Sequence, residues 1–151
     1  MAVVKGRSDL IHDPADATSV PADAKRARGR QVTLTGTLAN AAADSNTSKY
    51  HLGDLPSRCI PKELFFDVEN WGFAQVVIGT ETDTDALLDV AKSAATTQTI
   101  TTRGTANHAK ELWDMLGLSA DPGGMISLWV HAEADAAGAG SMPFELTYLT
   151  D

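Results

Sequence analysis

The chain has 151 residues, of which 43% are hydrophobic and 21% charged, as is typical of one soluble globular domain that can bury its own core. Its single cysteine, Cys59, excludes an internal disulfide and is typical of a protein made in a reducing cytoplasm. No apolar run approaches the roughly 18 residues of a membrane span, and residues 1–30 lack the uninterrupted apolar core of a secretory signal, so we expect no membrane partner.

The net charge of −8 is unevenly distributed along the chain. Residues 1–30 hold six basic and four acidic residues, which gives +2, so the remainder carries −10. Because neutralisation of phosphates supplies most non-specific affinity for nucleic acid, an acidic body of this kind is not expected to bind DNA or RNA.

Residues 1–30 have neither helical nor strand periodicity, and Pro14 and Pro21 interrupt them. Such a segment has too little apolar surface to offset its ordering entropy alone. We predict an extended N-terminal arm at residues 1–30 that orders on a neighbouring molecule, and a separate body at residues 31–151; a disordered tail is the alternative. The partner-binding residues that we expect are the spaced apolar and basic side chains of the arm: Lys5, Arg7, Leu10, Ile11, Val20, Lys25, Arg26, Arg28 and Arg30.

Period-two alternation of apolar residues then predicts strands near residues 30–39, 49–55, 63–68 and 74–79, with the NWG sequence at 70–72 as a hairpin turn. Residues 80–94 predict a short helix, because Thr82 stands three residues before Asp85 as in a capping box. A strand is expected around Ile100, and a second short helix at residues 108–118 is expected to end at Gly117.

The closing strands are predicted at residues 125–134 and 142–150, joined by a hairpin connection rich in alanine and glycine. These short strands, with only two brief helices, predict a mainly β fold. We expect an antiparallel β-sandwich or jelly-roll-like barrel with one or two short helices and an extended N-terminal arm.

No set of residues converges on a recognisable catalytic or metal-binding pattern. His108 and Glu111 could meet on a helix as zinc ligands, and the alternating acids Glu81, Asp83 and Asp85 suit calcium, but neither pattern is complete. Arg58 could lower the pKa of Cys59, although a lone cysteine is more often a small buried residue. We therefore expect no metal, no cofactor and no enzymatic activity.

The three tryptophans offer a different class of function. Trp113 and Trp129 occupy core-like positions, whereas Trp71 lies in a predicted turn and is expected to be exposed. A carbohydrate-binding module that uses Trp71 is thus an alternative reading of the chain.

Four stretches resemble, in their order and spacing, the head decoration (cement, or capsid-stabilising) proteins of tailed bacteriophages. They are SKYHLGDLPSRCI, NWGFAQVVIGT, KELWDMLGLSADPGG and AAGAGSMPFELTYL, and together they cover most of residues 30–149. The resemblance implies a non-enzymatic virion protein on the capsid exterior that binds the major capsid protein lattice, as a homotrimer or other homo-oligomer. Structural proteins of tails and head fibres share similar bodies, so that placement is a second alternative.

Overall fold

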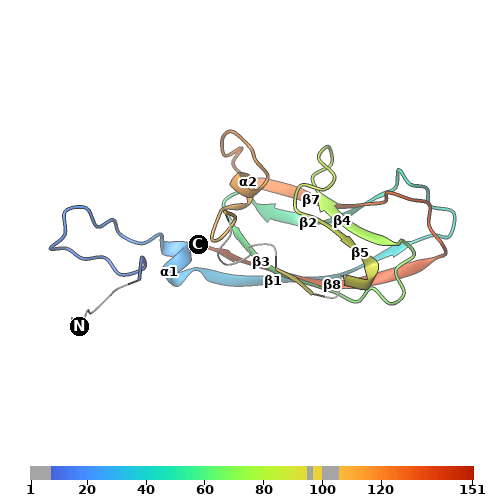
Figure 1. The fold of residues 1–151 in the computed structure, drawn as a ribbon, viewed down its shortest axis with the longest axis horizontal. Coiled ribbons are helices and arrows are strands. Elements are labelled where there is room, and N and C mark those ends of the chain that lie inside the picture. Colours follow the sequence, from blue (N-terminus) through green and yellow to red (C-terminus); the bar gives the residue numbers. More distant parts are fainter. Residues whose placement is uncertain (1–7, 95–96, 100–105) are drawn as a thin grey trace, which may run out of the picture.

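Two antiparallel four-stranded sheets lie face to face in the computed structural model, which describes residues 8–94, 97–99 and 106–151 (Figure 1). In sheet order, the first sheet contains β1 (Arg30–Asn40), β8 (Gly140–Thr150), β3 (Ile60–Phe66) and β6 (Thr97–Thr99). The second sheet contains β2 (Lys49–Pro56), β7 (Met125–His131), β4 (Gln75–Gly79) and β5 (Leu88–Ala91). The predicted β-sandwich is confirmed, and the sheets do not close into a barrel.

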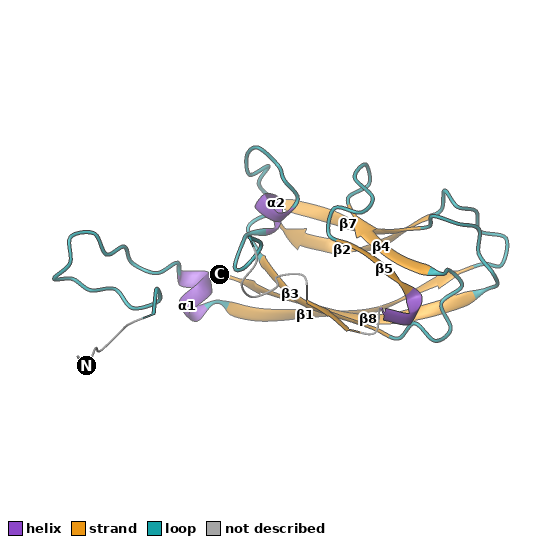
Figure 2. Ribbon diagram, in the orientation of Figure 1, coloured by secondary structure: helices purple, strands orange, loops and turns teal. Residues whose placement is uncertain are grey.

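The helices are short and lie at the ends of the sandwich (Figure 2). They are α1 (Ala24–Arg28), the 3-10 turn η1 (Lys92–Ala94) and α2 (Leu112–Met115). The predicted second helix is a single turn, and Gly117 follows it with φ of +70°, the left-handed conformation that glycine adopts readily. None of the helices in the described part of the chain has the length and apolar character that a membrane crossing requires.

The core lies between the two sheets and consists of alternate residues of the predicted strands. Leu64, Leu128 and Leu146 are fully buried, while Thr33 and Thr147 on the outer face of the first sheet are bonded to each other through their hydroxyl oxygens at 3.1 Å. Fully burying one such leucine contributes roughly 1.5–3 kcal/mol. The period-two alternation that predicted β3, β4, β7 and β8 is confirmed for most of the inward-facing residues, whereas Ala74, which we expected to face inward before β4, is exposed.

The predicted helix at residues 80–94 is wrong, because most of this segment is a loop followed by β5. Leu88 lies opposite Ile78, and Val90 lies opposite Val76, so Leu88, one of the apolar residues that suggested a helix, pairs across strands with β4 instead. Thr80, and not Thr82, closes the loop, since the Asp83 amide donates to its hydroxyl oxygen over 3.0 Å. Ile100, the predicted centre of a strand, lies outside the described residues; it follows β6 in the sequence.

Both predicted hairpins are wrong as well. The NWG segment carries the chain from β3 to β4, and residues 132–139 carry it from β7 to β8. In each case the two strands belong to different sheets, so these connections cross from one layer of the sandwich to the other. A crossover and a hairpin use the same turn-forming residues, and only the tertiary pairing distinguishes them.

These two crossovers bind each other at the end of the sandwich opposite α1. The Ala137 amide donates to the Gly72 carbonyl over 2.8 Å, and the side-chain amide of Asn40, at the end of β1, donates to the Gly138 carbonyl over 2.8 Å. Gly140 has no room for a side chain, because an added Cβ would lie 1.9 Å from the Asn70 carbonyl oxygen. The glycine-rich connection is therefore closely packed against the end of the sandwich.

We expect Gly140→Ala to lower the free energy of unfolding by about 1–3 kcal/mol, because backbone atoms must shift to admit the methyl group. Gly138→Ala is the matched control, since an added Cβ there meets nothing within 4 Å. Urea unfolding of the two variants measures the difference. Equal stability of the two variants would contradict the close packing of this end.

Candidate functional site

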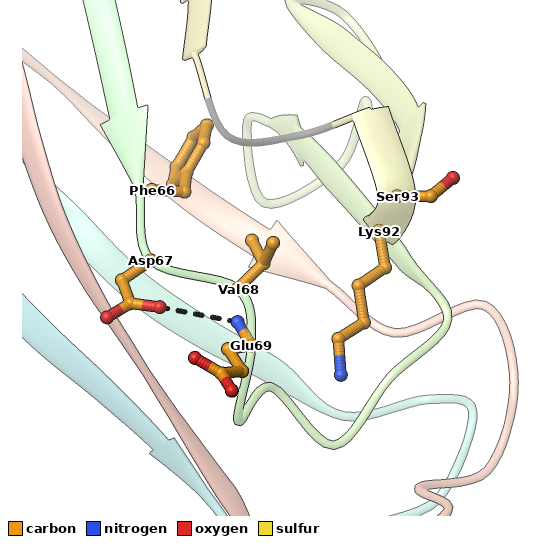
Figure 3. Close-up of a pocket in the computed structure, with 6 residues that line it drawn as sticks. All are labelled: Phe66, Asp67, Val68, Glu69, Lys92 and Ser93. Carbon is orange, nitrogen blue, oxygen red and sulfur yellow. Dashed lines mark hydrogen bonds between the residues drawn. The ribbon is translucent and has the colours of Figure 1, made fainter.

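A depression lies between η1 and the β3–β4 crossover (Figure 3). It has a volume of about 430 Å³ and is open to solvent, and its residues come from Phe66–Glu69 and from Lys92 and Ser93. The Lys92 ammonium donates to the Trp71 carbonyl over 2.7 Å, and the Asp67 carboxylate accepts from the Glu69 amide over 3.3 Å. These charged groups hold the crossover in place.

The metal-binding patterns considered from the sequence do not assemble. Within residues 8–94, 97–99 and 106–151, no group of three or more His, Cys, Asp or Glu side chains could hold an ion. His108 is exposed, whereas the Glu111 carboxylate already accepts hydrogen bonds from Lys25 and Trp113. Glu81, the first acid of the possible calcium cluster, forms an ion pair with Lys49.

Cys59 is fully buried, and burial raises the pKa of its thiol to about 12. The Arg58 guanidinium does not face the thiol; its Nε lies 3.6 Å from both the Glu111 and the Asp121 carboxylates. The thiol is thus protonated at neutral pH, and Cys59 is the small buried residue that the sequence favoured.

Trp71 is buried, so the predicted exposure of its ring is wrong, and with it the sugar-binding platform built on that residue. Its side chain is only 3% exposed, packs edge-on against Tyr50 with 5.5 Å between ring centroids, and donates to the Gln75 carbonyl. Trp113 and Trp129 are both half-buried, and Trp129 stacks on His51 at 4.8 Å. Trp129 alternates with the buried Leu128 and Val130, so the core-like position that we expected for it is wrong.

The most unusual surface feature is the segment that precedes α1. Residues 8–22, here called the projecting loop, extend away from the sandwich beyond α1 (Figure 1). Leu10, Ile11 and Val20 are 38%, 57% and 76% exposed. Local bonds shape the loop, among them Asp13 N to Ser19 Oγ at 2.9 Å and Thr18 Oγ1 to the Asp16 carboxylate at 2.7 Å. The loop therefore presents apolar side chains to solvent without a core of its own.

α1 attaches this loop to the sandwich. Asp23 caps the helix by accepting from the Lys25 and Arg26 amides, and Arg26 pairs with Asp9 across the base of the loop. Lys25 is 5% exposed, and its ammonium donates to the Arg58 carbonyl over 2.7 Å and forms an ion pair with Glu111. A buried cation requires such partners, so Lys25 determines where α1 docks.

Glu111 holds the other side of this anchor, which consists of Lys25, Glu111 and Trp113. The Trp113 indole donates to the second oxygen of the Glu111 carboxylate over 2.7 Å. Burial alone would raise the pKa of Glu111, but the hydrogen bonds from Lys25 and Trp113 outweigh it, and the net pKa is lowered. No sequence pattern predicts the pairing of Lys25 with Glu111, because the two residues are separated by 86 positions.

The structure divides the predicted partner-binding residues into three groups. Leu10, Ile11 and Val20 lie exposed on the projecting loop, and Arg28 and Arg30 lie exposed at its base with no ion pair to a described residue. Lys25 and Arg26 are engaged within the chain by Glu111 and Asp9. Lys5 and Arg7 lie outside the described residues.

We expect Lys25→Ala to lower the free energy of unfolding by about 3 kcal/mol, because it leaves the Glu111 carboxylate half-buried without its cation. Arg28→Ala, in the same helix but exposed, is expected to change stability by less than about 0.5 kcal/mol. Urea unfolding measures both values, and limited proteolysis at α1 reports detachment of the helix. Similar behaviour of the two variants would refute the anchor.

The anchor also predicts a pH dependence. Because the pKa of Glu111 is lower in the folded chain than in the unfolded chain, its stabilisation is present above the unfolded value near 4.5 and is lost as the pH falls through the folded value. Glu111→Gln removes this titration, so its stability should decline less than that of the wild type between about pH 6 and about pH 3. Parallel declines in a urea series at several pH values would exclude a role for Glu111 in acid sensitivity.

Comparison with known proteins shows a similarity at the level of structure. No protein-family profile and no curated protein matches the sequence. The chain is similar to a chain of the cyanophage Pam1 capsid asymmetric unit, with 16% sequence identity and a TM-score of 0.48. That similarity covers 82% of this chain and 86% of the other.

Proposed function

We propose that this chain is a structural virion protein that decorates and stabilises a tailed-phage capsid. In this proposal the sandwich body sits on the outer surface of the major capsid protein lattice, and the N-terminal arm, residues 1–30, reaches neighbouring capsid subunits. The protein acts by binding alone and catalyses no reaction.

The observation that carries the proposal is the combination of an exposed apolar loop with a buried anchor. Leu10, Ile11 and Val20 face solvent, yet the base of their loop is fixed to the body by the Lys25–Glu111 ion pair. A loop that had only to remain soluble would not need apolar side chains at these positions. Their exposure therefore favours a surface that a partner covers.

The anchor also favours binding by the arm, because it orders the base of the projecting loop before a partner is present. A fully disordered tail loses much conformational entropy when it binds, and this loss reduces its affinity. The local bonds of the projecting loop, such as those of Asp13 and Asp16, already restrict its backbone before binding. An arm of this kind can connect two subunits at a smaller entropic cost.

Charge supports a protein partner for the arm. Arg28 and Arg30 are exposed at the base of the loop, while the chain as a whole carries −8. A basic patch on an acidic molecule favours docking in one orientation, with the arm toward acidic groups of the partner. The resemblance of residues 30–149 to head decoration proteins of tailed phages identifies that partner, in this proposal, as the major capsid protein.

We expect the triple variant Leu10→Ser, Ile11→Ser, Val20→Ser to bind capsid shells at least about tenfold more weakly, because each apolar side chain buried contributes roughly 1.5–3 kcal/mol. The shells are assembled from the major capsid protein encoded in the same genome, and co-sedimentation measures binding. Met125→Ser is the matched control, since Met125 is 58% exposed on the body, close to the 57% of Ile11.

Deletion of residues 1–22 extends this test while it keeps α1 and the anchor. We expect a folded body, verified by its urea transition, that fails to bind the shells. Undiminished binding by the deletion variant would refute the role of the arm. Failure of the intact chain to bind shells, with binding to purified tails instead, would refute the capsid proposal and favour a tail protein.

A further inference from the structure

β1 is an edge strand of the first sheet without the features that usually protect an edge. Its eleven residues pair with β8 in an unbroken register from Arg30 opposite Thr150 to Asn40 opposite Gly140. From Gln31 to Asn40 it contains no charged residue and no proline. Among the described residues, no backbone group of this strand bonds to any segment except β8. Such an edge is open to pairing with another strand.

The other edges of the sandwich are protected. β2 carries Lys49 and Asp54, ends at Pro56, and has a bulge between His51 and Gly53. β5 and β6 have only four and three residues. Bulges, charges, proline and short length all discourage pairing, so β1 is distinguished by the absence of these features in the described part of the chain.

A groove with both polar and apolar walls runs beside the open edge. It has a volume of about 480 Å³ and lies between β1 and β2, where Leu34, Leu38, Leu52 and Phe144 contribute to its walls. Gly36 contributes to this opening, because an added Cβ there would lie 2.8 Å from the Phe144 ring. A strand paired with β1 would bring its inward-facing side chains over this groove.

The sequence of β1 is complementary to itself in the antiparallel direction. With Thr35 on a two-fold axis, Thr33 lies opposite Thr37 of a second copy, and Val32 lies opposite Leu38. Residues that face the core then meet residues that face the core, while threonines meet threonines on the outer face. Cross-strand pairs of both kinds are favourable, and no two like charges are opposed.

The ends of the molecule are also complementary in charge. Arg28 and Arg30 lie exposed at the start of β1, whereas the loops beyond its end carry the exposed acids Glu133 and Asp135. Asp135 lies beside the loop that follows β1, because its carboxylate accepts from the Asn46 amide over 3.0 Å. Antiparallel pairing brings the basic end of one copy to the acidic end of the other, which selects a second copy as the occupant of the edge.

We infer that two copies of this chain pair through their β1 strands about a two-fold axis at Thr35, which joins their four-stranded sheets into one sheet of eight strands. This isologous contact leaves the two projecting loops at opposite ends of the dimer. The inference rests on the edge, the groove and the charges, and is independent of the proposed capsid function.

Sedimentation equilibrium of the full chain tests the inference. We expect a dimer of twice the 15.9 kDa chain mass for the wild type. Thr35→Lys places two ammonium groups opposite each other on the axis and should raise the dissociation constant by about fivefold or more. Thr147→Lys is the matched control, because Thr147 is on the same outer face but in the central strand β8, and it should remain dimeric.

Disulfide trapping provides a second measurement that does not depend on the strength of association. Oxidised Thr35→Cys should form a covalent dimer, whereas Thr147→Cys should not, and the buried native Cys59 is not expected to react. A monomeric or trimeric wild type, or equal cross-linking of the two variants, would overturn the inference. Any of these results would leave the capsid-binding test unaffected, since that test depends on the projecting loop.

Discussion

A buried ammonium group determines how the N-terminal segment joins this molecule. Lys25 is almost fully removed from water, so its charge has to be balanced and its protons have to be accepted within the protein. The Arg58 carbonyl, in the turn between β2 and β3, and the Glu111 carboxylate, just before α2, meet both needs. α1 therefore docks at one end of the sandwich, and the loop before it has to leave the body in one direction.

The opposite end of the sandwich is closed in a different way. There two crossovers pack backbone against backbone around Asn40, and glycines at 72 and 140 permit the close approach. One end thus presents a loop with exposed apolar and basic side chains, and the other presents acidic loops. We propose that a binding function uses these two ends of the sandwich and the edge strand β1.

The sequence predicted most of the sandwich, because period-two alternation reports directly which face of a strand is buried. The prediction failed where local and tertiary preferences disagree. Residues 80–94 begin like a capped helix, but Leu88 and Val90 pair with β4. We expected Trp71 to be exposed in a hairpin turn, but the turn crosses between the two sheets and the ring is buried. Turn-forming residues do not distinguish a hairpin from such a crossover. The arm was predicted from its lack of periodicity, whereas its anchor was not, since Lys25 and Glu111 are brought together only by the fold.

We propose that the projecting loop is the part of the chain that binds the capsid. Amide hydrogen exchange of the intact chain, with and without capsid shells assembled from the major capsid protein of the same genome, tests it most directly. We expect capsid shells to slow amide hydrogen exchange within residues 8–22, where few backbone amides are held by strand or helix bonds in the free chain. Unchanged exchange in this loop, while amides of the sandwich become protected by the shells, would contradict it.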